Sequence, residues 1–530
     1  MRLRIGNRQR SFGLATLVAL LALFVGGTSY SDSEPAAIQP VTVSVPGPSF
    51  SNNIKFAANG RLVLTAPFSP STATRLDLAV EWSELDNDHV ISLNAREPGA
   101  GPVQLDLIDG QGNRYFYPSN VLFDAATGTV FVRATRIGPD GLEAGEYICY
   151  APLSADGSAW KGSLVPVQIP QIGDGSEAAY MPSSFGLGRD SKVLVYTNGS
   201  QVFLFSLAEG YSYPVGPFPQ GDVALLEDYN ADYNCVSSVS VDRATNTVVV
   251  TVNTRKTDDA KGTSFFSQLY FYHLDEEPGP AFGTMDLIRI VSSAELSGAS
   301  ISPYSDVLIV ESAAFFALDD GSICSVDLTH SGPVHVFATV PELAADALTA
   351  GSPHLLNYDT ASKTLAVVKK GQVFDIKRPT YIKRPTYLFL QEKPAIALVN
   401  IGQGAVRVLQ AQDWGPGLSN GIFDQNSNLI LATFAGSIVS VSAGGVATLC
   451  GIPTLTDKLV FDPSEMTLAG VSSVNVNPAR AKITTAGSIL LVGTNAAKAS
   501  TGVVGSLLAA PAAGLARATG SIRRPGNIVW

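Results

Sequence analysis

Histidine and cysteine, which most metal and nucleophile sites need, are scarce in this chain. It has five His and four Cys among 530 residues, and no two cysteines form a C-x-x-C pair. This spacing excludes a zinc-finger type of metal site. The cysteines allow disulfides, but two of them lie inside apolar strand patterns, where a free cysteine is often simply a buried apolar residue. The four are Cys149, Cys235, Cys324 and Cys450.

Helical periodicity and, towards the C-terminus, acidic residues are also missing. No long stretch keeps an apolar repeat of helical period, which excludes a helical architecture. The formal net charge is −11, and this acidic balance argues against nucleic acid or an anionic membrane as the main partner. After Glu465 the chain has no Asp or Glu, so we interpret the basic, Ala/Gly-rich residues 501–530 as a tail or a closing strand.

The N-terminus carries the longest apolar run. Four Arg residues precede FGLATLVALLALFV, and small residues follow it up to residue 31. A run of about 14 apolar residues is short for a membrane span and typical of a secretory signal. We therefore expect residues 1–31 to be a signal peptide and the protein to be secreted and extracellular. The alternative is an uncleaved signal that anchors the chain in a membrane.

What the chain does have is a phrase that returns about eight times. Each copy joins a short apolar strand, a turn often opened by Asp or Asn, and a second strand of Val, Leu and Ile. The second strands recur about every 61 residues, which leaves room for four strands and generous loops. Clear copies begin at Val121, Val239, Leu356 and Gly421, and looser ones at Ile54, Phe185, Ser300 and Val474.

Repeated four-stranded units bury their faces against one another when they are arranged radially. The repeat therefore predicts an all-β fold, a β-propeller of eight blades with about four antiparallel strands each, across residues 32–500. Seven blades are the alternative. We expect Val41–Val45 to pair with the last blade and close the ring. A stacked solenoid would need shorter, stricter repeats and distinct capping ends, which the sequence does not show.

An Asp recurs where the first strand of the phrase ends. It stands at Asp124, Asp242, Asp359 and Asp424. An Asp side chain in a turn accepts hydrogen bonds from backbone N–H groups two residues further on. We therefore interpret this repeated acid as a structural residue that holds the hairpin, and we assign it no chemistry.

About four residues before this turn, seven of the eight copies carry Asn or Ser. The first strand of each propeller blade lines the central channel, so these side chains should form a polar ring at one mouth. Such groups over an apolar body suit a small polar ligand or a metal, although Asn and Ser are also common wherever loops meet strands. The predicted ligand-binding residues are Asn53, Asn120, Ser184, Ser238, Ser300, His354, Asn420 and Ser473.

One segment has the spacing of a calcium loop. Asp228, Asn230 and Asp232 stand at alternate positions, as the oxygen ligands of such a loop do. Tyr233 replaces the glycine that the sharp turn prefers, and Val239 replaces the closing Glu. A solvated acidic loop is therefore the alternative interpretation.

A second segment, LSNG at Leu418–Gly421, resembles the calcium-dependent lactonase and NHL-type propellers of the SMP-30/gluconolactonase-like superfamily. The resemblance implies that Asn420 coordinates a divalent cation. The family's early Glu and later metal-binding Asp have no counterpart, because Asn53 and Ser473 occupy those places. The resemblance supports the fold more than the activity.

Three short motifs lie outside this scheme. Gly417–Gly421 matches G-x-S-x-G but runs directly into a strand, whereas a hydrolase elbow needs a strand, a turn and a helix. Asn198 opens a glycosylation sequon in a predicted turn. IKRPTY occurs twice in Ile376–Tyr387, which indicates a tandem duplication in a surface loop, with a basic docking loop as the alternative.

The sequence therefore favours a secreted β-propeller that binds a small polar ligand or an extracellular protein without catalysis. The alternatives are a divalent-metal-dependent hydrolase of the lactonase or esterase type and a calcium-dependent adhesion module. The first function requires no cofactor, whereas the other two would use a divalent cation such as calcium. We expect no nucleic-acid partner, and a membrane contact only through an uncleaved N-terminal segment.

Overall fold

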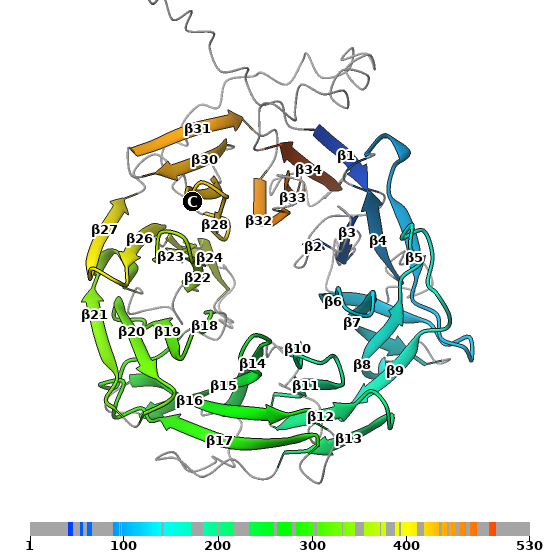
Figure 1. The fold of residues 1–530 in the computed structure, drawn as a ribbon, viewed down its shortest axis with the longest axis horizontal. Coiled ribbons are helices and arrows are strands. Elements are labelled where there is room, and N and C mark those ends of the chain that lie inside the picture. Colours follow the sequence, from blue (N-terminus) through cyan, green and yellow to red (C-terminus); the bar gives the residue numbers. More distant parts are fainter. Residues whose placement is uncertain are drawn as a thin grey trace, which may run out of the picture.

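In the computed structural model, four-stranded antiparallel sheets stand around a common centre (Figure 1). The structure describes residues 41–45, 54–56, 61–65, most of 88–451, 455–462, 467–473 and 487–493. The longest gaps within 88–451 are 171–183, 216–232, 345–353, 378–386 and 411–417. The described residues form eight four-stranded sheets, which confirms the predicted β-propeller with eight blades. Residues 1–31 and 501–530, predicted as signal peptide and tail, lie outside this part.

The first four blades take their strands in chain order from the centre outwards (Figure 1). Blade 1 comprises β2 (Ile54–Phe56), β3 (Arg61–Thr65), β4 (His89–Asn94) and β5 (Val103–Asp106), with the 3-10 turn η3 (Pro98–Ala100). Blade 2 comprises β6 (Tyr115–Asp124), β7 (Thr129–Ile137), β8 (Glu143–Pro152) and β9 (Val165–Ile169). Blade 3 comprises β10 (Phe185–Leu187), β11 (Val193–Thr197), β12 (Val202–Ser206) and β13 (Tyr211–Pro214). Blade 4 comprises β14 (Tyr233–Asp242), β15 (Thr247–Asp258), β16 (Gly262–Asp275) and β17 (Thr284–Val291).

The next three blades repeat this order, with one hairpin inserted. Blade 5 comprises β18 (Leu308–Val310), β19 (Ala313–Ala317), β20 (Ser322–Asp327) and β21 (His335–Thr339), followed by η5 (Pro341–Leu343). Blade 6 comprises β22 (His354–Asp359), β23 (Thr364–Lys369), β26 (Ala395–Asn400) and β27 (Ala405–Gln410). The inserted hairpin is β24 (Val373–Lys377) and β25 (Tyr387–Gln391). Blade 7 comprises β28 (Ile422–Phe423), β29 (Leu429–Thr433), β30 (Ser437–Ser442) and β31 (Gly445–Gly451).

Blade 8 joins the two ends of the chain. Its strands β32 (Leu455–Asp462), β33 (Thr467–Ser473) and β34 (Gly487–Gly493) are completed by β1 (Val41–Val45). The register pairs Val41 with Leu491 and Val45 with Gly487, antiparallel. The prediction that Val41–Val45 closes the ring is confirmed, and closure removes the open edge that an unpaired terminal blade would leave.

The middle strands of the blades are apolar on both faces because each blade packs against two neighbours. All five residues of β11, of β12 and of β29 are buried. Outer strands are more exposed: in β13 only Ser212 is partly buried, and the other three residues are exposed. The core therefore lies between blades, as in the cluster where Phe131 and Ile148 of blade 2 meet Leu194 and Phe203 of blade 3.

In two looser copies of the phrase, the strands were predicted at the wrong positions within their blades. The copy at Ser300 was expected to enter its second strand near residue 306, but Leu308–Val310 is the inner strand and β19 is the second. The copy at Val474 was expected to open the last blade, yet β34 is the third strand of that blade. The inner strand there is β32, whose LVFD ends in an Asp five residues before β33, as the clear copies do.

The repeated Asp fixes the first hairpin of its blade, as predicted. Asp124 accepts hydrogen bonds from the N–H groups of Ala126 and Thr127 at 3.3 and 3.2 Å. Asp242, Asp359 and Asp424 receive equivalent bonds from their own turns. These bonds hold the inner strand and the second strand at a fixed separation.

Blade 3 lacks this Asp and receives a substitute from blade 4. Gly188 stands where the Asp would be, five residues before β11. The buried carboxylate of Glu276 instead accepts hydrogen bonds from the N–H groups of Asp190, Lys192 and Val193 at 3.0–3.1 Å. A Cβ on Gly188 would lie 2.1 Å from Glu276 Oε1, so the glycine makes room for the neighbour's acid. The turn is therefore capped across the junction of two blades.

The described cysteines behave as buried apolar residues. Cys149, Cys324 and Cys450 are free thiols in the core. Burial raises the pKa of the Cys324 thiol to about 12, so it stays protonated at neutral pH. The side chain of Cys235 lies outside the described part.

The duplicated IKRPTY segment spans the end of β24, residues 378–386 and the start of β25. The duplication therefore lies in the hairpin inserted between β23 and β26, although its central residues fall outside the described part. No helix among the described residues is both long and apolar enough to span a membrane.

Candidate functional site

Two of the predicted ring residues lie just before an inner strand, and two lie in the middle of one. Ser184 precedes β10, Asn420 precedes β28, and Asn120 and Ser238 lie within β6 and β14; all four are half-buried. The Ser184 hydroxyl accepts a hydrogen bond from the N–H of Val239 in the next blade. Ser184 therefore joins two blades, and its use by a ligand would compete with that bond.

Three other ring residues are not placed as the sequence predicted. His354 begins β22, but its side chain is buried and its Nε2 lies 2.8 Å from the carbonyl oxygen of Leu343. Ser300 is buried before blade 5 and donates to the Asp319 carboxylate. Ser473 ends the second strand of blade 8 instead of opening its inner strand. The equal spacing in the sequence therefore does not produce one ring, because two copies were out of phase.

The eighth ring residue and the calcium loop are not described. Asn53, Asp228, Asn230 and Asp232 lie outside the described residues. The calcium loop therefore stays a prediction.

The surroundings of Asn420 do not complete a metal site in the described part of the chain. Ser419 is fully buried; its hydroxyl accepts from the N–H of Ala432 at 2.8 Å and donates to the carbonyl of Asn420 at 2.9 Å. Ser419 thus anchors the loop. Its hydroxyl is not exposed as the nucleophile of a G-x-S-x-G elbow would be. No group of three or more His, Cys, Asp or Glu in the described residues is placed to hold a metal ion. The donor set of a lactonase is not found there.

The sequon residue Asn198 has a structural role in the turn before β12. Its Nδ2 donates to the carbonyl of Pro170 at 2.8 Å, and its Oδ1 accepts from the N–H of Gln201 at 2.9 Å. A glycan on Nδ2 would have to displace the bond to Pro170. Glycosylation at Asn198 stays a prediction, since Ser200 lies outside the described residues.

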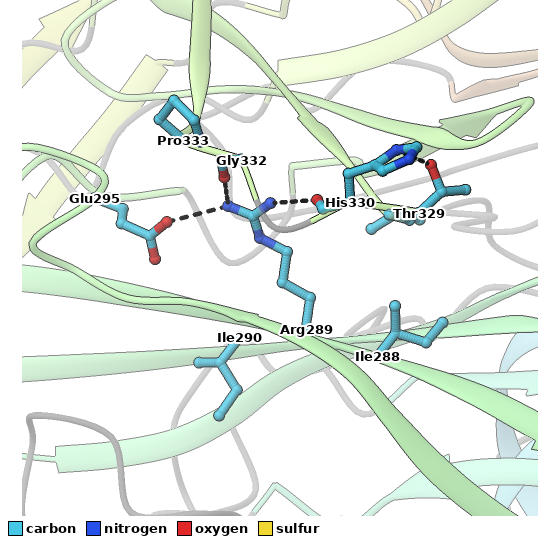
Figure 2. A pocket seen from close by; sticks show the side chains of 9 residues that line it. Ile288, Arg289, Ile290, Glu295, Thr329, His330, Gly332 and Pro333 are labelled. Atoms are coloured by element: carbon cyan, nitrogen blue, oxygen red, sulfur yellow. Dashed lines mark hydrogen bonds and ion pairs between the residues drawn. The ribbon is translucent and has the colours of Figure 1, made fainter.

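Within the described part of the chain, three of the pockets between blades offer space for a ligand. The first, the Arg289 pocket, has a volume of about 420 Å³ between β17 and the turn that joins β20 to β21. Figure 2 shows the Arg289 side chain reaching from its strand between Glu295 and the backbone of Gly332 and His330. The guanidinium donates to Glu295 Oε1 at 3.1 Å and to the carbonyl oxygens of Asp327 and Gly332.

The other polar side chains of the Arg289 pocket, Thr329 and His330, are paired with each other and with the neighbouring Asp327. The Asp327 carboxylate accepts hydrogen bonds from the N–H and hydroxyl of Thr329, both at 2.7 Å. These bonds, with a smaller contribution from His330, hold the pKa of Asp327 at about 2. His330 Nδ1 lies 2.7 Å from the Thr329 hydroxyl (Figure 2). Each polar side chain that lines this pocket thus has a partner in the protein.

The second, the Tyr213 pocket, has about 430 Å³ between blades 3 and 4. Its walls are mainly apolar, with Leu204, Phe282 and Met285 among them. Its one acidic group, Glu209, accepts a hydrogen bond from the Tyr213 hydroxyl, and this bond raises the pKa of Tyr213. The Glu209 carboxylate, like the polar groups of the Arg289 pocket, already has a hydrogen-bond partner within the protein.

The third, the Glu311 pocket, has about 380 Å³ between the inner strands β18 and β22 and the turns that follow them. Leu308, Ile309, Val310 and Leu356 supply its apolar surface; Glu311, Asn357, Tyr358, Thr360 and Lys363 supply its polar groups. Among the described residues, no side-chain hydrogen bond or ion pair occupies Glu311, Asn357 or Lys363. In this respect the pocket differs from the other two.

The Glu311 pocket is preformed because the two inner strands are joined at their other end. The N–H of Asp306 donates to the carbonyl of His354 at 2.8 Å, and the Asp306 carboxylate accepts from the N–H of Leu356 at 3.0 Å. The Ser305 hydroxyl accepts from the N–H of His354 at 2.8 Å. These bonds hold the starts of β18 and β22 together. In the described part of the chain, the turns that follow the two strands are not joined in this way, and the pocket lies between them.

The ring residues predicted from the sequence lie at the opposite end of the same inner strands. Asn357 and Tyr358 follow His354 along β22. Glu311 was not predicted to lie in a turn, because Leu308–Val310 was assigned to the second strand of blade 5 instead of the inner strand. One signal was available: Glu311 is a lone acid between the apolar runs VLIV and AAFFAL. An isolated charge between two apolar strands indicates a short turn.

No model of a known protein family matches the chain, and no curated protein matches it either. Among solved structures, a europium-containing methanol dehydrogenase is similar at 9% identity over 84% of this chain and 92% of that chain, with a TM-score of 0.49. Saccharomyces cerevisiae Sqt1 is similar at 12% identity over 85% and 99% of the two chains, with a TM-score of 0.42. Likenesses this weak say nothing about activity, and the fold assignment rests on the sheets themselves.

Proposed function

We propose that the chain is a secreted β-propeller binding protein and that the Glu311 pocket is its ligand site. The observation that supports this most is the set of polar side chains, Glu311, Asn357 and Lys363, that have no partner in the described part of the chain. Ligand sites combine an apolar surface with a few polar groups that fix orientation. Secretion is proposed from the basic and apolar segment in residues 1–31.

The chemistry of the pocket suits recognition more than reaction. Partial burial raises the pKa of Tyr358, and the charges of Glu311 and Asp359 raise it further. The phenol therefore stays protonated at neutral pH and serves as a hydrogen-bond donor. The acid that borders it, Asp359, is held by the turn through the N–H groups of Ala361 and Ser362.

A thermal-shift screen with defined sugars, organic acids, amines and amino acids tests the proposal. A ligand that binds only the folded state raises the melting temperature in proportion to its occupancy. We expect at least one compound to stabilise the wild type and to lose this effect in Asn357→Leu. Asn426→Leu, which changes an exposed amide in the turn after the inner strand of blade 7, is the control and should respond like the wild type. Hits that stabilise Asn357→Leu as strongly as the wild type would contradict the proposal.

A lactonase-type hydrolase is the second candidate, supported by the LSNG segment, whose loop Ser419 holds in place. Metal analysis of the purified protein separates the candidates. Calcium that is lost in Asn420→Ala would support the hydrolase, and calcium that is lost in Asp232→Ala would support the adhesion module. A metal-free protein that melts identically with and without EDTA excludes both.

A further inference from the structure

Two opposite charges border the Glu311 pocket without pairing. Glu311 lies in the turn between β18 and β19, and Lys363 lies in the turn between β22 and β23. Both line the same space, yet no ion pair within 4.0 Å joins them or ties either to another described residue. Each charge is exposed and available.

Both charged residues have a backbone conformation that is uncommon for residues other than glycine. Glu311 has a φ of 56° and Lys363 a φ of 54°, both in the left-handed region. Lys363 occupies a position where other hairpins of the ring also use this region, as Asn246 does at 57°. Glu311 differs, because it opens a two-residue turn where Gly, Asn or Asp is the usual residue. Strain kept at a pocket by a charged side chain points to function.

The space between the charges is apolar and small. Leu308 and Val310 contribute from β18, and Leu356 from β22. A volume of about 380 Å³ is near the lower end of the range for ligand pockets, roughly 300–1,000 Å³. The ligand is therefore compact and has an apolar portion.

We propose that the Glu311 pocket binds zwitterions: a free α-amino acid with an apolar side chain, or a very short peptide with free termini. This inference rests on the proposed function and names its ligand class. The ligand's ammonium group pairs with the Glu311 carboxylate, and its carboxylate pairs with the Lys363 ammonium and the Asn357 amide. Charge-assisted hydrogen bonds of this kind are stronger than neutral ones. The apolar side chain lies on the Leu and Val surface.

Ligands with one charge fit less well. A simple cation meets Lys363, and a simple anion meets Glu311, so either leaves one protein charge opposed or unpaired. A polyphosphate or nucleic acid would place many anions against a single lysine and a carboxylate. The opposite charges therefore select for a ligand that carries both signs.

Isothermal titration with three probes of one shape tests the inference: L-leucine, L-leucinamide without the carboxylate, and 4-methylpentanoate without the ammonium. We expect wild-type protein to prefer L-leucine over each analogue by about tenfold or more. Lys363→Met should abolish the preference over leucinamide, and Glu311→Gln should abolish the preference over 4-methylpentanoate. Both residues are exposed, and a melting curve for each variant verifies folding.

The outcomes separate the ligand class from the site. Equal binding of the three probes, or a preference that survives both substitutions, overturns the inference. If no amino acid binds but a sugar or organic acid depends on Asn357, the pocket remains a ligand site and the zwitterion class is wrong. If a ligand binds and ignores every pocket variant, both proposals are wrong.

Discussion

Two neighbouring junctions of the ring use polar side chains in opposite ways. Between blades 4 and 5, Arg289 donates to Glu295 and to backbone carbonyls, so the polar side chains that line the pocket there are hydrogen-bonded within the protein. Between blades 5 and 6, hydrogen bonds join the starts of the two inner strands and tie Lys369 to the η5 segment, whereas Glu311 and Lys363 at the turn end stay unpaired among the described residues. A paired polar group stabilises the fold, whereas an unpaired one in a preformed pocket is available to a ligand. The comparison predicts that substitutions at the first kind of residue change stability and those at the second change binding.

The largest stability effect among these variants should come from Glu276, a buried acid that accepts three backbone hydrogen bonds across a blade junction. Glu276→Ala leaves three N–H groups of the β10–β11 turn without their acceptor, and we expect the free energy of unfolding to fall by about 2–4 kcal/mol. Denaturant unfolding measures the loss. The exposed neighbour Glu277 provides the control, since Glu277→Ala should stay within about 0.5 kcal/mol of the wild type.

A compensating substitution makes this test sharper. Gly188→Asp in the Glu276→Ala background should restore part of the lost stability, because the new carboxylate would stand where the other blades have theirs. In the wild-type background the same substitution should destabilise, since its Cβ would lie 2.1 Å from the Glu276 carboxylate. If Gly188→Asp were equally harmful in both backgrounds, the cap would not be the role of Glu276.

Arg289→Met should have a smaller effect of the same kind. The substitution keeps the apolar stem and removes the donors to Glu295 and the carbonyls of the β20–β21 turn. We expect a loss of about 1–2 kcal/mol in the free energy of unfolding and no change in L-leucine affinity. Weaker leucine binding with unchanged stability would reverse the distinction between the two junctions.

Acid stability distinguishes paired carboxylates from unpaired ones. Burial would raise the pKa of Asp109, but hydrogen bonds from Asn113 and Tyr115 outweigh it and hold the value at about 2, against 3.8 ordinarily. Since the folded-state pKa is the lower one, the stabilisation is complete above the ordinary value and is lost as pH falls through about 2. Unfolding curves between these pH values should therefore be steeper with pH in the wild type than in Asp109→Asn.

The smallest effect on stability, and of opposite sign, should come from Glu311→Gly. Glycine adopts a φ of 56° without strain, so we expect the free energy of unfolding to rise by up to about 1 kcal/mol. Loss of the carboxylate should at the same time remove the preference for L-leucine over 4-methylpentanoate. A variant that loses stability would show that Glu311 is held by contacts of its own.

The sequence was sufficient for features that repeat and insufficient for those that occur once. The Asp–turn phrase predicted the blades, and its Asp residues hold hairpins as expected. Val41–Val45 was predicted to close the ring, and it pairs with β34 of blade 8. The copy LVFDPSEMTLAG was overlooked although it has the same spacing, and this omission put Ser473 in the wrong place.

Contacts between distant residues could not be predicted in the same way. Glu276 caps a turn more than eighty residues earlier, and the only trace of this is that Gly188 replaces the repeated Asp. The Glu311 pocket depends on how two turns of neighbouring blades are spaced, which follows from packing between sheets. Alignment of the copies shows which residues are equivalent but not which of them remain unpaired.

The most direct test of the account is a titration of L-leucine and L-leucinamide into the wild type and Lys363→Met. The account predicts that the wild type prefers leucine by about tenfold or more and that the variant, with an unchanged melting temperature, binds both probes equally. Equal affinity of the wild type for the two probes, or a preference retained in Lys363→Met, would contradict the claim that unpaired charges at this junction select the ligand.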